Sequence, residues 1–356
     1  MDVALLILAP SLALTLLSLV ILIRLAPMMG LMDSPGGRKH HARHTPVVGG
    51  LAISIGLLPL LVLFPAYSIS VLCWFAASIL LLFVGLADDI WDITPLQKFL
   101  GQVISGLFLL PAGLVLSDLG YLLGPDLLQL AWLGAPLTLF AVATAINGMN
   151  MLDGIDGLLG LVAAVPLAIM FWLAWRSGLA FETALAGCLL LGLIAFLMFN
   201  FRFPWVHHAS VFLGDAGSTM VGFNTAWLAI ALAVKDVIPP VLALYLLALP
   251  LLDLVGVMLR RRLRGVSAAT PGRDHLHHIL LDAGFSVPLT ALLLAALALL
   301  FAGGGLLGWQ LGMHERWLFL IFMMALLGYV LFSRSVQRVV LALRLLMSRF
   351  KHNMTV

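Results

Sequence analysis

The stretch SISVLCWFAASILLLFVGLADD, residues 68–89, decides which class of fold this chain adopts. Its apolar part, residues 68–86, carries no charge and is long enough to cross the hydrocarbon core of a bilayer, which takes about 20 helical residues. Two carboxylates, Asp88 and Asp89, follow almost at once. Because charge is costly in hydrocarbon, we interpret these acids as the end of a membrane span at the membrane surface.

Long apolar runs separated by short polar segments recur along the whole chain. Hydrophobic residues make up 63% of the 356 residues and charged residues only 10%, a composition that excludes a soluble domain of this length. The sequence therefore predicts an all-α polytopic membrane protein, a single domain over residues 1–356 with about eleven transmembrane helices. The expected helices cover residues 3–23, 47–65, 68–86, 99–117, 130–147, 158–175, 184–200, 217–234, 238–258, 287–308 and 315–333.

The distribution of lysine and arginine predicts the orientation of these helices, because cytoplasmic loops of membrane proteins carry an excess of both residues. With the first loop placed in the cytoplasm, all but three of the 19 basic residues lie on the cytoplasmic side, the exceptions being Arg176, Lys235 and Arg316. The N-terminus is then outside and the C-terminus cytoplasmic. The same distribution accounts for the basic pI of about 9.1, so we expect no nucleic-acid partner.

Four polar motifs fall on the cytoplasmic side in this arrangement, although they play no part in the definition of the apolar runs. Polar groups repeated at span ends on one side of a membrane indicate one shared site. Transporters instead place binding groups near the membrane midplane, where only Asp253 lies in this chain; it either lines the floor of the site or pairs with a basic side chain. The motifs are GLADD (85–89), NGMNMLDGIDGL (147–158), FLGDAGS (212–218) and RDHLHH (273–278).

Two of the acidic motifs leave a structural and a functional interpretation open. Asp88 and Asp92 are one helical turn apart, so they are either a solvated helix end or carboxylates that bind a divalent cation together with substrate phosphates. Asp215, between two glycines at the start of a run, suits an N-cap, and this interpretation is compatible with a functional one, because a helix N-terminus also suits phosphate oxygens.

The motif NGMNMLDGIDGL favours function more strongly. Its polar residues Asn147, Asn150, Asp153 and Asp156 recur every three residues, a regularity that a simple turn does not need. On an ideal helix this spacing drifts too far for the four side chains to share one stripe. The three glycines of the motif indicate that the helix loosens there, and they allow the backbone to approach a ligand closely.

The basic segments suit anionic ligands. Adjacent histidines, as in His277 and His278, are poorly spaced for a single zinc ion, so a hydrogen-bonding cradle for a diphosphate fits the group with His275 better. The arginines before them are explained in part by loop topology. In the first loop, DSPGGRKHH (33–41), Arg38 and Lys39 either hold nucleotide phosphates or only set the topology.

Taken together and in this order, GLADD, NGMNMLDGIDGL, FLGDAGS and HLHH resemble the polyprenyl-phosphate N-acetylhexosamine-1-phosphate transferases over nearly the whole chain. The resemblance implies an Mg²⁺-dependent enzyme, with Mn²⁺ as an alternative ion, that moves a sugar 1-phosphate from a UDP-sugar to a lipid phosphate and releases UMP. The loops DSPGGRKHH…VVGG and PGRDHLHH…AGF resemble the WecA-type branch, which uses UDP-GlcNAc and undecaprenyl phosphate. Leu276 interrupts the run of histidines typical of the phospho-MurNAc-pentapeptide transferases of peptidoglycan synthesis, the runner-up.

The resemblance also implies roles for single residues. Asp215 corresponds to the principal Mg²⁺ ligand and Asn150 to a second group beside the metal. Asp88 and Asp89 correspond to an acidic pair near the lipid phosphate, one of them proposed as its base. Lys98 corresponds to a basic residue that holds this phosphate. Because a phosphate monoester with a second pKa of about 6 is already largely dianionic at neutral pH, a base is chemically optional.

The resemblance likewise implies which residues contact the nucleotide and the sugar. The resemblance places Asp156 and Phe212 against the uracil, Asp153 in the same nucleotide-binding group, and Arg38 and Lys39 more loosely as a basic pair. The histidines of HLHH (His275, His277 and His278) correspond to the diphosphate–sugar region. The protein would then lie in the bacterial cytoplasmic (inner) membrane with a cytoplasmic active site, as a monomer or homodimer, and start cell-surface polysaccharide synthesis, as for lipopolysaccharide. Outside this enzyme class, a polytopic transporter and a non-catalytic lipid- or nucleotide-binding protein remain alternatives.

Overall fold

The computed structural model describes residues 3–33, 44–64, 68–203, 208–263, 265, 272, 274–334, 340–342 and 344. Helices dominate this part of the chain, which confirms the all-α prediction, and a short antiparallel pair, β1 (Met32–Asp33) and β2 (Thr45–Pro46), is its one sheet. The helices are α1 (Val3–Leu6), α2 (Leu8–Met29), α3 (Gly49–Leu57), α4 (Pro59–Leu63), α5 (Ile69–Trp91), α6 (Pro95–Leu107), α7 (Gly134–Leu152), α8 (Leu158–Arg176), α9 (Ala180–Asn200), α10 (Gly214–Val234), α11 (Pro240–Leu246), α12 (Ala248–Leu263), α13 (Leu276–Asp282), α14 (Val287–Gln310) and α15 (Glu315–Arg334), with a 3₁₀ turn at Ala131–Leu133.

Within the described residues, eight helices are long and apolar enough to cross a membrane, and the bent pair α11–α12 makes a ninth if it counts as one span. The chain is therefore a multi-pass membrane protein. Two of the expected spans are shorter than predicted: residues 47–65 form α3 and α4 in succession, and residues 99–117 are helical only as far as Leu107. Helix lengths thus do not confirm eleven crossings.

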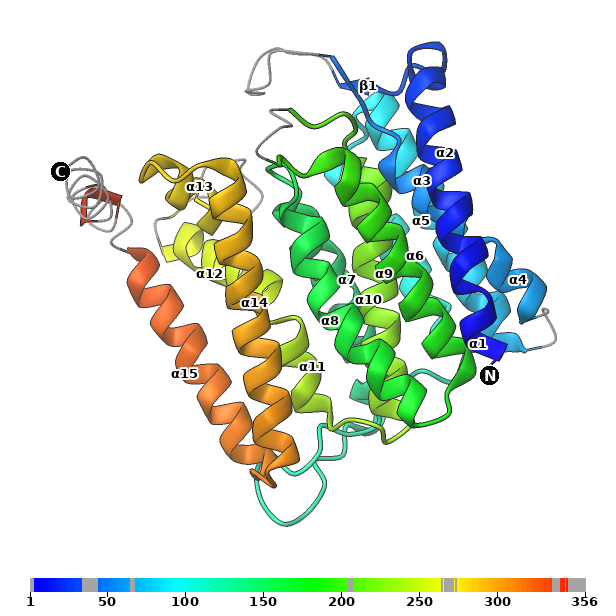
Figure 1. The fold of residues 1–356 in the computed structure, drawn as a ribbon. Helices are drawn as coiled ribbons and strands as arrows, with labels where there is room; N and C mark the ends of the chain where they lie inside the picture. Colours follow the sequence, from blue (N-terminus) through cyan, green and yellow to red (C-terminus); the bar gives the residue numbers. More distant parts are fainter. Residues whose placement is uncertain are drawn as a thin grey trace.

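Proline explains the sharpest departure from the predicted helices. The run 238–258 was expected as one helix but bends by 81° between α11 and α12. Pro250 has no backbone N–H to donate to the carbonyl of Leu246, and its ring would crowd that carbonyl, so α11 ends at Leu246. The bend carries α12 away from the direction of α11 and toward the end of the molecule that holds α13 (Figure 1).

The central helix is α10, which is buried along almost its whole length between α3, α5, α7 and α8. Its first half is rich in glycine, alanine, serine and threonine. Small side chains let neighbouring helix backbones approach closely, which is the main way that helices pack tightly where lipid offers no hydrophobic drive. The position of α10 therefore depends on backbone contacts with its neighbours.

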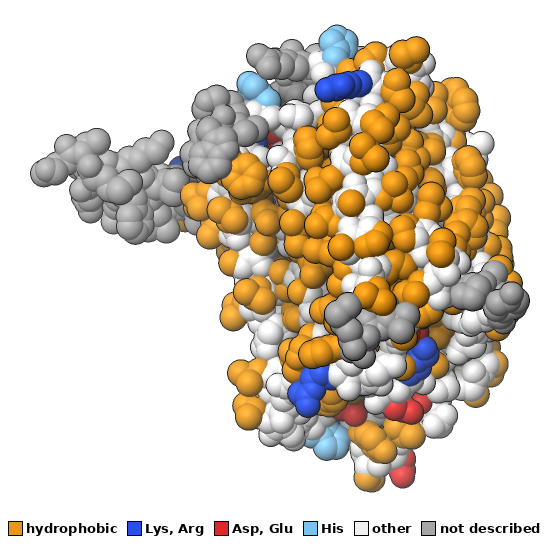
Figure 2. Space-filling view, turned by 45° about the vertical axis from the view of Figure 1, so that its right-hand side comes forward, with side chains coloured by type: hydrophobic (Ala, Val, Ile, Leu, Met, Phe, Trp, Pro, Cys, Tyr) orange, Lys and Arg blue, Asp and Glu red, His pale blue; other side chains and the backbone are white. Residues whose placement is uncertain are grey.

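The two ends of the molecule differ. β1 and α13 lie at one end, whereas the beginning of the described chain and the long loop between α6 and α7 lie at the other (Figure 1). On the face drawn in Figure 2, hydrophobic side chains cover the middle and charged side chains lie toward the ends. This distribution is the one expected of a protein whose middle is surrounded by lipid.

The helix α7 corrects one prediction about the motif NGMNMLDGIDGL. The helix continues regularly through Gly148 to Leu152, so the loosening expected in this motif does not occur at Gly148 and begins only after Leu152. A Cβ on Gly148 would lie 3.1 Å from the backbone oxygen of Pro250, and the glycine therefore allows α7 to pack against α12. The chain leaves the helix at Asp153, and Gly157 adopts the left-handed conformation, with φ of 80°, immediately before α8.

Candidate active site

The four polar motifs meet at one end of the molecule, around a cavity of about 1050 Å³. Side chains from α5, α7, α10 and α13 line it, together with the segments that follow α7 and α9. The sequence prediction that the motifs share one site is in agreement with this arrangement. The polar residues that line the cavity are Asp33, Asp88, Asp89, Asp92, Asn150, Asp153, Asp156, Asn200, Arg202, Asp215, Ser218 and His278.

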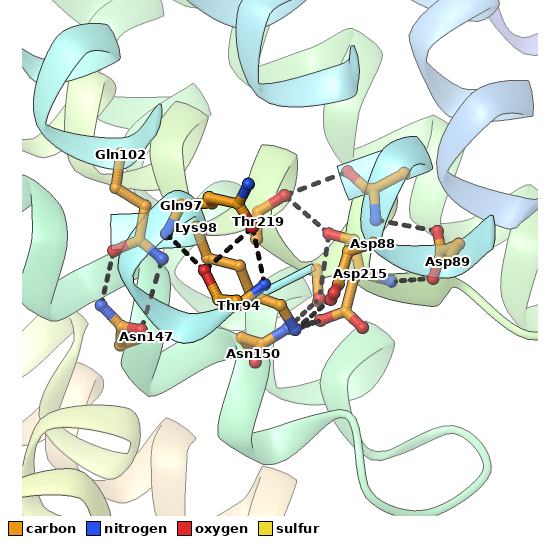
Figure 3. Close-up of polar contacts among 12 residues, drawn as sticks. Asp88, Asp89, Thr94, Gln97, Lys98, Gln102, Asn147, Asn150, Asp215 and Thr219 are labelled. Carbon is orange, nitrogen blue, oxygen red and sulfur yellow. Dashed lines mark hydrogen bonds and ion pairs between the residues drawn. The ribbon is translucent and has the colours of Figure 1, made fainter. Parts of the chain in front are cut away.

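Asp89 holds the beginning of α10 in place. One of its carboxylate oxygens accepts a hydrogen bond from the backbone N–H of Asp215 at 2.8 Å, and the other accepts one from Ala216 at 3.1 Å. The first N–H groups of a helix have no partner within the helix, and here a side chain from α5 supplies one. Asp215 itself lies in the first turn of α10 and is not its N-cap, so its carboxylate remains directed at the site (Figure 3).

Two glycines bring neighbouring backbones against the same turn of α10. A Cβ on Gly85 of α5 would lie 2.2 Å from Cα of Ala216, and a Cβ on Gly50 of α3 would lie 2.2 Å from Cα of Gly217. No side chain larger than hydrogen fits at either position without moving α10. The sequence motif GLADD therefore combines two structural functions, because its glycine allows the close approach and its last aspartate caps the helix.

Asn150 orients the carboxylate of Asp215. The amide nitrogen of Asn150, on α7, donates to Oδ1 of Asp215 at 2.6 Å and to the hydroxyl of Ser218 at 2.8 Å (Figure 3). In the part of the chain that the structure describes, the amide oxygen of Asn150 has no hydrogen bond, which leaves it as a possible oxygen ligand beside Asp215. One turn earlier on α7, Asn147 exchanges hydrogen bonds with Gln102 of α6 and so ties these two helices together.

Asp88 differs from its neighbour Asp89, because it forms an ion pair with Lys98. The Nζ atom of Lys98 also lies 3.9 Å from Oδ1 of Asp215. The negative charges of Asp88 and Asp215 beside its ammonium group favour the cationic form of Lys98. Lys98 is in the first turn of α6, which a capping box between Thr94 and Gln97 stabilises.

The segment after α7 is bound to the segment after α9 by two residues that the sequence interpretation did not assign to the site. Asn200 accepts a hydrogen bond from the N–H of Gly157 at 2.6 Å and donates one to the carbonyl of Val211 at 2.8 Å. Arg202 forms a salt bridge of 2.6 Å with Asp156. The signal for both was the polar sequence NFR at the end of an apolar run, where Arg202 was counted only toward topology.

Carboxylates crowd this cavity. Burial raises the pKa of Asp153 to about 8, and the negative charges of Asp215, Asp89 and Asp156 add to the effect. Between the ordinary aspartate pKa of 3.8 and a pH of about 8, Asp153 is protonated in the folded protein and ionised in the unfolded chain. Its contribution to the free energy of unfolding therefore falls as pH rises through this range. A bound cation would relieve this repulsion.

The histidine motif forms one wall of the cavity through His278. His277 lies against the segment after α7, since a Cβ on Gly154 would lie 2.4 Å from its Nε2 atom. His275 pairs with Asp253, whose carboxylate lies 2.8 Å from Nδ1. Of the two alternatives for Asp253, pairing with a basic side chain is therefore the one observed.

Two further predicted groups have different outcomes. Phe212 lines the cavity, and its backbone bonds to Pro46 and Gly49 attach the FLGDAGS segment to the start of α3. Arg38 and Lys39 lie outside the described residues, so their assignment to the nucleotide remains a prediction.

The donor atoms at the centre fit a hard divalent cation that is completed by substrate. No group of three or more histidine, cysteine, aspartate or glutamate side chains among the described residues is arranged to hold a metal ion by itself. Mg²⁺ commonly takes only one or two carboxylates and fills its octahedral shell with phosphate oxygens and water. The carboxylate of Asp215 is one oxygen donor of this kind, and Asn150, whose amide nitrogen donates to that carboxylate at 2.6 Å, carries a second donor in its amide oxygen.

Comparison with known proteins is consistent with this geometry. Residues 71–233 match the family described as glycosyl transferase family 4. The chain is also 33% identical to the undecaprenyl-phosphate α-N-acetylglucosaminyl 1-phosphate transferase of Salmonella typhi over 321 residues, which cover 88% of this chain and 86% of that protein. For the proteins of the same name from Yersinia pestis and Haemophilus influenzae, the identity is 33% in both cases, covering 93% and 88% of this chain and 90% and 89% of those proteins.

Similarity of this extent runs through all four motifs and the helices that carry them. A chain with these motifs around one cavity, and with a third of its residues shared over most of its length, belongs to the family of undecaprenyl-phosphate α-N-acetylglucosaminyl 1-phosphate transferases.

Proposed function

We propose that this protein transfers GlcNAc 1-phosphate from UDP-GlcNAc to undecaprenyl phosphate, releases UMP and thereby starts a lipid-linked cell-surface polysaccharide. The observation that carries the proposal is the single cavity that receives side chains from all four polar motifs. The names of the relatives support the choice of substrates. A transporter is disfavoured, because its binding groups would lie near the middle of the membrane, and these lie at one end.

In the proposed reaction, an oxygen of the lipid phosphate attacks the β-phosphorus of the UDP-sugar. The bond from this phosphorus to the bridging oxygen breaks, and UMP leaves with the electron pair. Such transfers depend on positioning and on neutralisation of charge. A Mg²⁺ ion bound to Asp215 and Asn150 would neutralise charge on the diphosphate and on the leaving UMP.

In this scheme, some residues bind the lipid phosphate and others bind the nucleotide sugar. Lys98 holds the lipid phosphate, and Asp88 orients Lys98 through their ion pair. Asp89 does not act as a base in this scheme, because both of its oxygens are occupied by backbone N–H groups of α10. On the nucleotide side, Phe212 and Asp156 meet the uracil, while His278 faces the diphosphate and sugar.

An apolar cavity supports the proposal of a long prenyl substrate. It has a volume of about 270 Å³ and lies between α7, α10 and α11. Phe140, Ala141 and Thr144 of α7 line it, and farther along the same helix Asn150 lines the polar cavity. A chain that lies along this face would have its phosphate end near Lys98.

We further propose the finer topology of eleven crossings, in which the bent pair α11–α12 counts once and the two short segments, α3–α4 and α6 with the turns after it, each cross the membrane. The N-terminus is outside, and the polar cavity faces the cytoplasm of a bacterium from its inner membrane. The basic residues at the helix ends opposite the cavity are the three expected outside, Arg176, Lys235 and Arg316. This distribution satisfies the positive-inside rule.

The proposal is tested with purified protein, undecaprenyl phosphate, Mg²⁺ and one UDP-sugar at a time, with UMP release as the readout. Release from UDP-GlcNAc with formation of lipid-linked GlcNAc diphosphate is expected. Release only from UDP-MurNAc-pentapeptide would move the protein to the peptidoglycan branch. The absence of release from any UDP-sugar, in a sample that remains monodisperse, would contradict the enzyme assignment.

Removal of divalent cations is expected to stop the reaction. EDTA should reduce UMP release to background, and an excess of Mg²⁺ or Mn²⁺ should restore it, because the acidic cavity repels two anionic substrates unless a cation neutralises them. The measurement is the initial rate against free Mg²⁺ concentration, with Ca²⁺ as a control for simple charge screening. A rate that is unchanged in EDTA would exclude the cation from the mechanism.

Truncation of Arg202 is expected to weaken nucleotide-sugar binding. Arg202→Ala leaves Asp156 without its counter-charge, and truncating one member of such a partly buried pair costs on the order of 2 kcal/mol or more. We expect KM for UDP-GlcNAc to rise at least ~10-fold with a smaller change in kcat. Arg176→Ala, which removes an arginine that covers Trp172 at the opposite end, is the matched control. Equal KM values in the two variants would contradict the nucleotide-side role.

A further inference from the structure

Among the described residues, the most buried acid outside the four motifs is Asp253 of α12, which is 2% exposed. Three hydrogen-bond donors from two other elements converge on its carboxylate. Nδ1 of His275 lies 2.8 Å from one oxygen, while the N–H of Leu276 at 3.1 Å and the hydroxyl of Tyr329 at 2.5 Å reach the other. A carboxylate in its ionised form only accepts hydrogen bonds, so the Nδ1 atom of His275 carries the proton.

The tyrosine comes from α15, the last long helix, which none of the motifs includes. Its ring lies directly on Gly256 of α12, since a Cβ there would be 2.2 Å from Cε1 of Tyr329. Only a glycine leaves room for the ring at this point, one turn after Asp253. Tyr329 is therefore held in two ways: its ring packs on Gly256, and its hydroxyl donates a hydrogen bond to Asp253.

Asp253 also contacts the histidine motif that forms one wall of the active site. The carboxylate holds both the ring of His275 and the N–H of Leu276, which begins α13. The ring of His275 stacks on that of His277, with 5.9 Å between centroids and 10° between planes. His277 in turn lies on Gly154, and His278 lines the polar cavity.

Two arginines of α12 bind Asp274, the residue that precedes His275. Nη2 of Arg260 donates to the carbonyl of Asp274 at 2.7 Å, and Nε of Arg261 lies 3.3 Å from its carboxylate. These bonds hold the chain at residue 274, but they do not contact the histidine rings. The ring of His275, by contrast, is oriented by its hydrogen bond with Asp253.

We propose that Tyr329 and Asp253 are positioning residues of the transferase, which together set the ring orientation and tautomer of His275 and thereby place the histidine wall of the cavity against the diphosphate–sugar group of the substrate. This inference rests on the proposed function, since it assigns the histidine wall to the nucleotide sugar. It makes α15 part of the active-site support, although none of the described side chains of α15 lines the cavity.

The chain offers a matched control for the tyrosine. Tyr245 of α11 also lies on a glycine, Gly305 of α14, and its hydroxyl donates to the carbonyl of Leu318 at 2.6 Å. It therefore makes a comparable buried contact between two helices, and it does not belong to the lining of the polar cavity. Tyr329→Phe and Tyr245→Phe each remove one hydroxyl and keep the ring in place, so a purely structural effect should be similar in both.

The kinetic test compares the two variants and Asp253→Asn with the wild-type protein. For Tyr329→Phe we expect kcat/KM for UDP-GlcNAc to fall about 10-fold, and for Asp253→Asn about 100-fold, which is the loss typical when a catalytic arrangement is displaced by about 1 Å. KM for undecaprenyl phosphate should not change, because Lys98 and Asp88 are on other helices. Tyr245→Phe should retain the kinetic constants of the wild-type protein. Equal kinetic constants for the two tyrosine variants would overturn the inference.

A second readout does not depend on activity. In protein labelled with ¹⁵N-histidine, the resonances of His275 are assigned by their loss in His275→Gln. We expect Asp253→Asn and Tyr329→Phe to shift them and Tyr245→Phe to leave them unchanged. Unchanged His275 resonances in Tyr329→Phe would also overturn the inference.

The two readouts separate the inference from the function on which it rests. If the wild-type protein released no UMP from any UDP-sugar, the proposed function would fail, and the resonances of His275 would still decide whether Tyr329 and Asp253 control its ring. If the wild-type protein were active while Tyr329→Phe and Tyr245→Phe behaved alike, the function would stand and the positioning role would be wrong.

Discussion

Replacing Asp215 by asparagine is expected to lower the rate of sugar 1-phosphate transfer by ~10³-fold or more, the scale of loss when a group that stabilises transition-state charge is removed. Asparagine has nearly the same shape and can still accept the hydrogen bond that Asn150 donates at 2.6 Å. It lacks the negative charge that would bind a divalent cation. The protein should therefore fold as before and lose only its chemistry, measured as UMP release at saturating substrates.

The comparison with Asp88 makes this prediction specific. Asp88→Asn should retain measurable activity, because the lipid phosphate is already largely dianionic at neutral pH, with a second pKa of about 6, and needs no base. Asp88 orients Lys98 through an ion pair, so its loss should chiefly raise KM for undecaprenyl phosphate. Complete and equal loss of activity in the two variants would contradict the optional role of the base.

A methyl group on Gly85 is expected to reduce activity at least ~100-fold although this residue contacts no substrate. Its Cβ would lie 2.2 Å from Cα of Ala216 and 2.5 Å from the backbone nitrogen, so backbone must move. The movement would separate Asp89 from the N–H groups that it caps and shift Asp215 away from Asn150. The measurement is kcat/KM for UDP-GlcNAc in Gly85→Ala, with thermal stability in detergent recorded on the same sample.

The control for this variant is another helical glycine of a membrane span. Among the described residues, no atom beyond the neighbouring backbone of α14 lies within 4 Å of a Cβ built on Gly303, so Gly303→Ala should leave activity unchanged and raise helix stability by up to ~1 kcal/mol. If Gly85→Ala does not yield folded protein, Gly50→Ala tests the same turn of α10 from α3. Wild-type activity in a folded variant at either position would contradict the view that backbone contact positions Asp215.

The sequence alone predicted the class of fold and the shared location of the four motifs. An apolar run long enough to form a spanning helix must be surrounded by lipid or protein, and this can be recognised from the residues of the run itself. The alternation of such runs with charged segments was therefore enough to predict a polytopic helical protein. The shared location of the four motifs followed from the same count of spans. The structure agrees, since side chains from all four motifs line one cavity.

Tertiary structure alone decided what each neighbouring side chain does. Asp88 and Asp89 are adjacent and chemically identical, yet one pairs with Lys98 and the other caps α10, because consecutive residues of a helix point in different directions. The bend at Pro250, the bridge that Asn200 makes between two loops and the contact of Tyr329 with Asp253 were likewise not predicted. Each of these features depends on how helices distant in the sequence pack together. The residue pattern within one helix does not indicate which other helix it will contact.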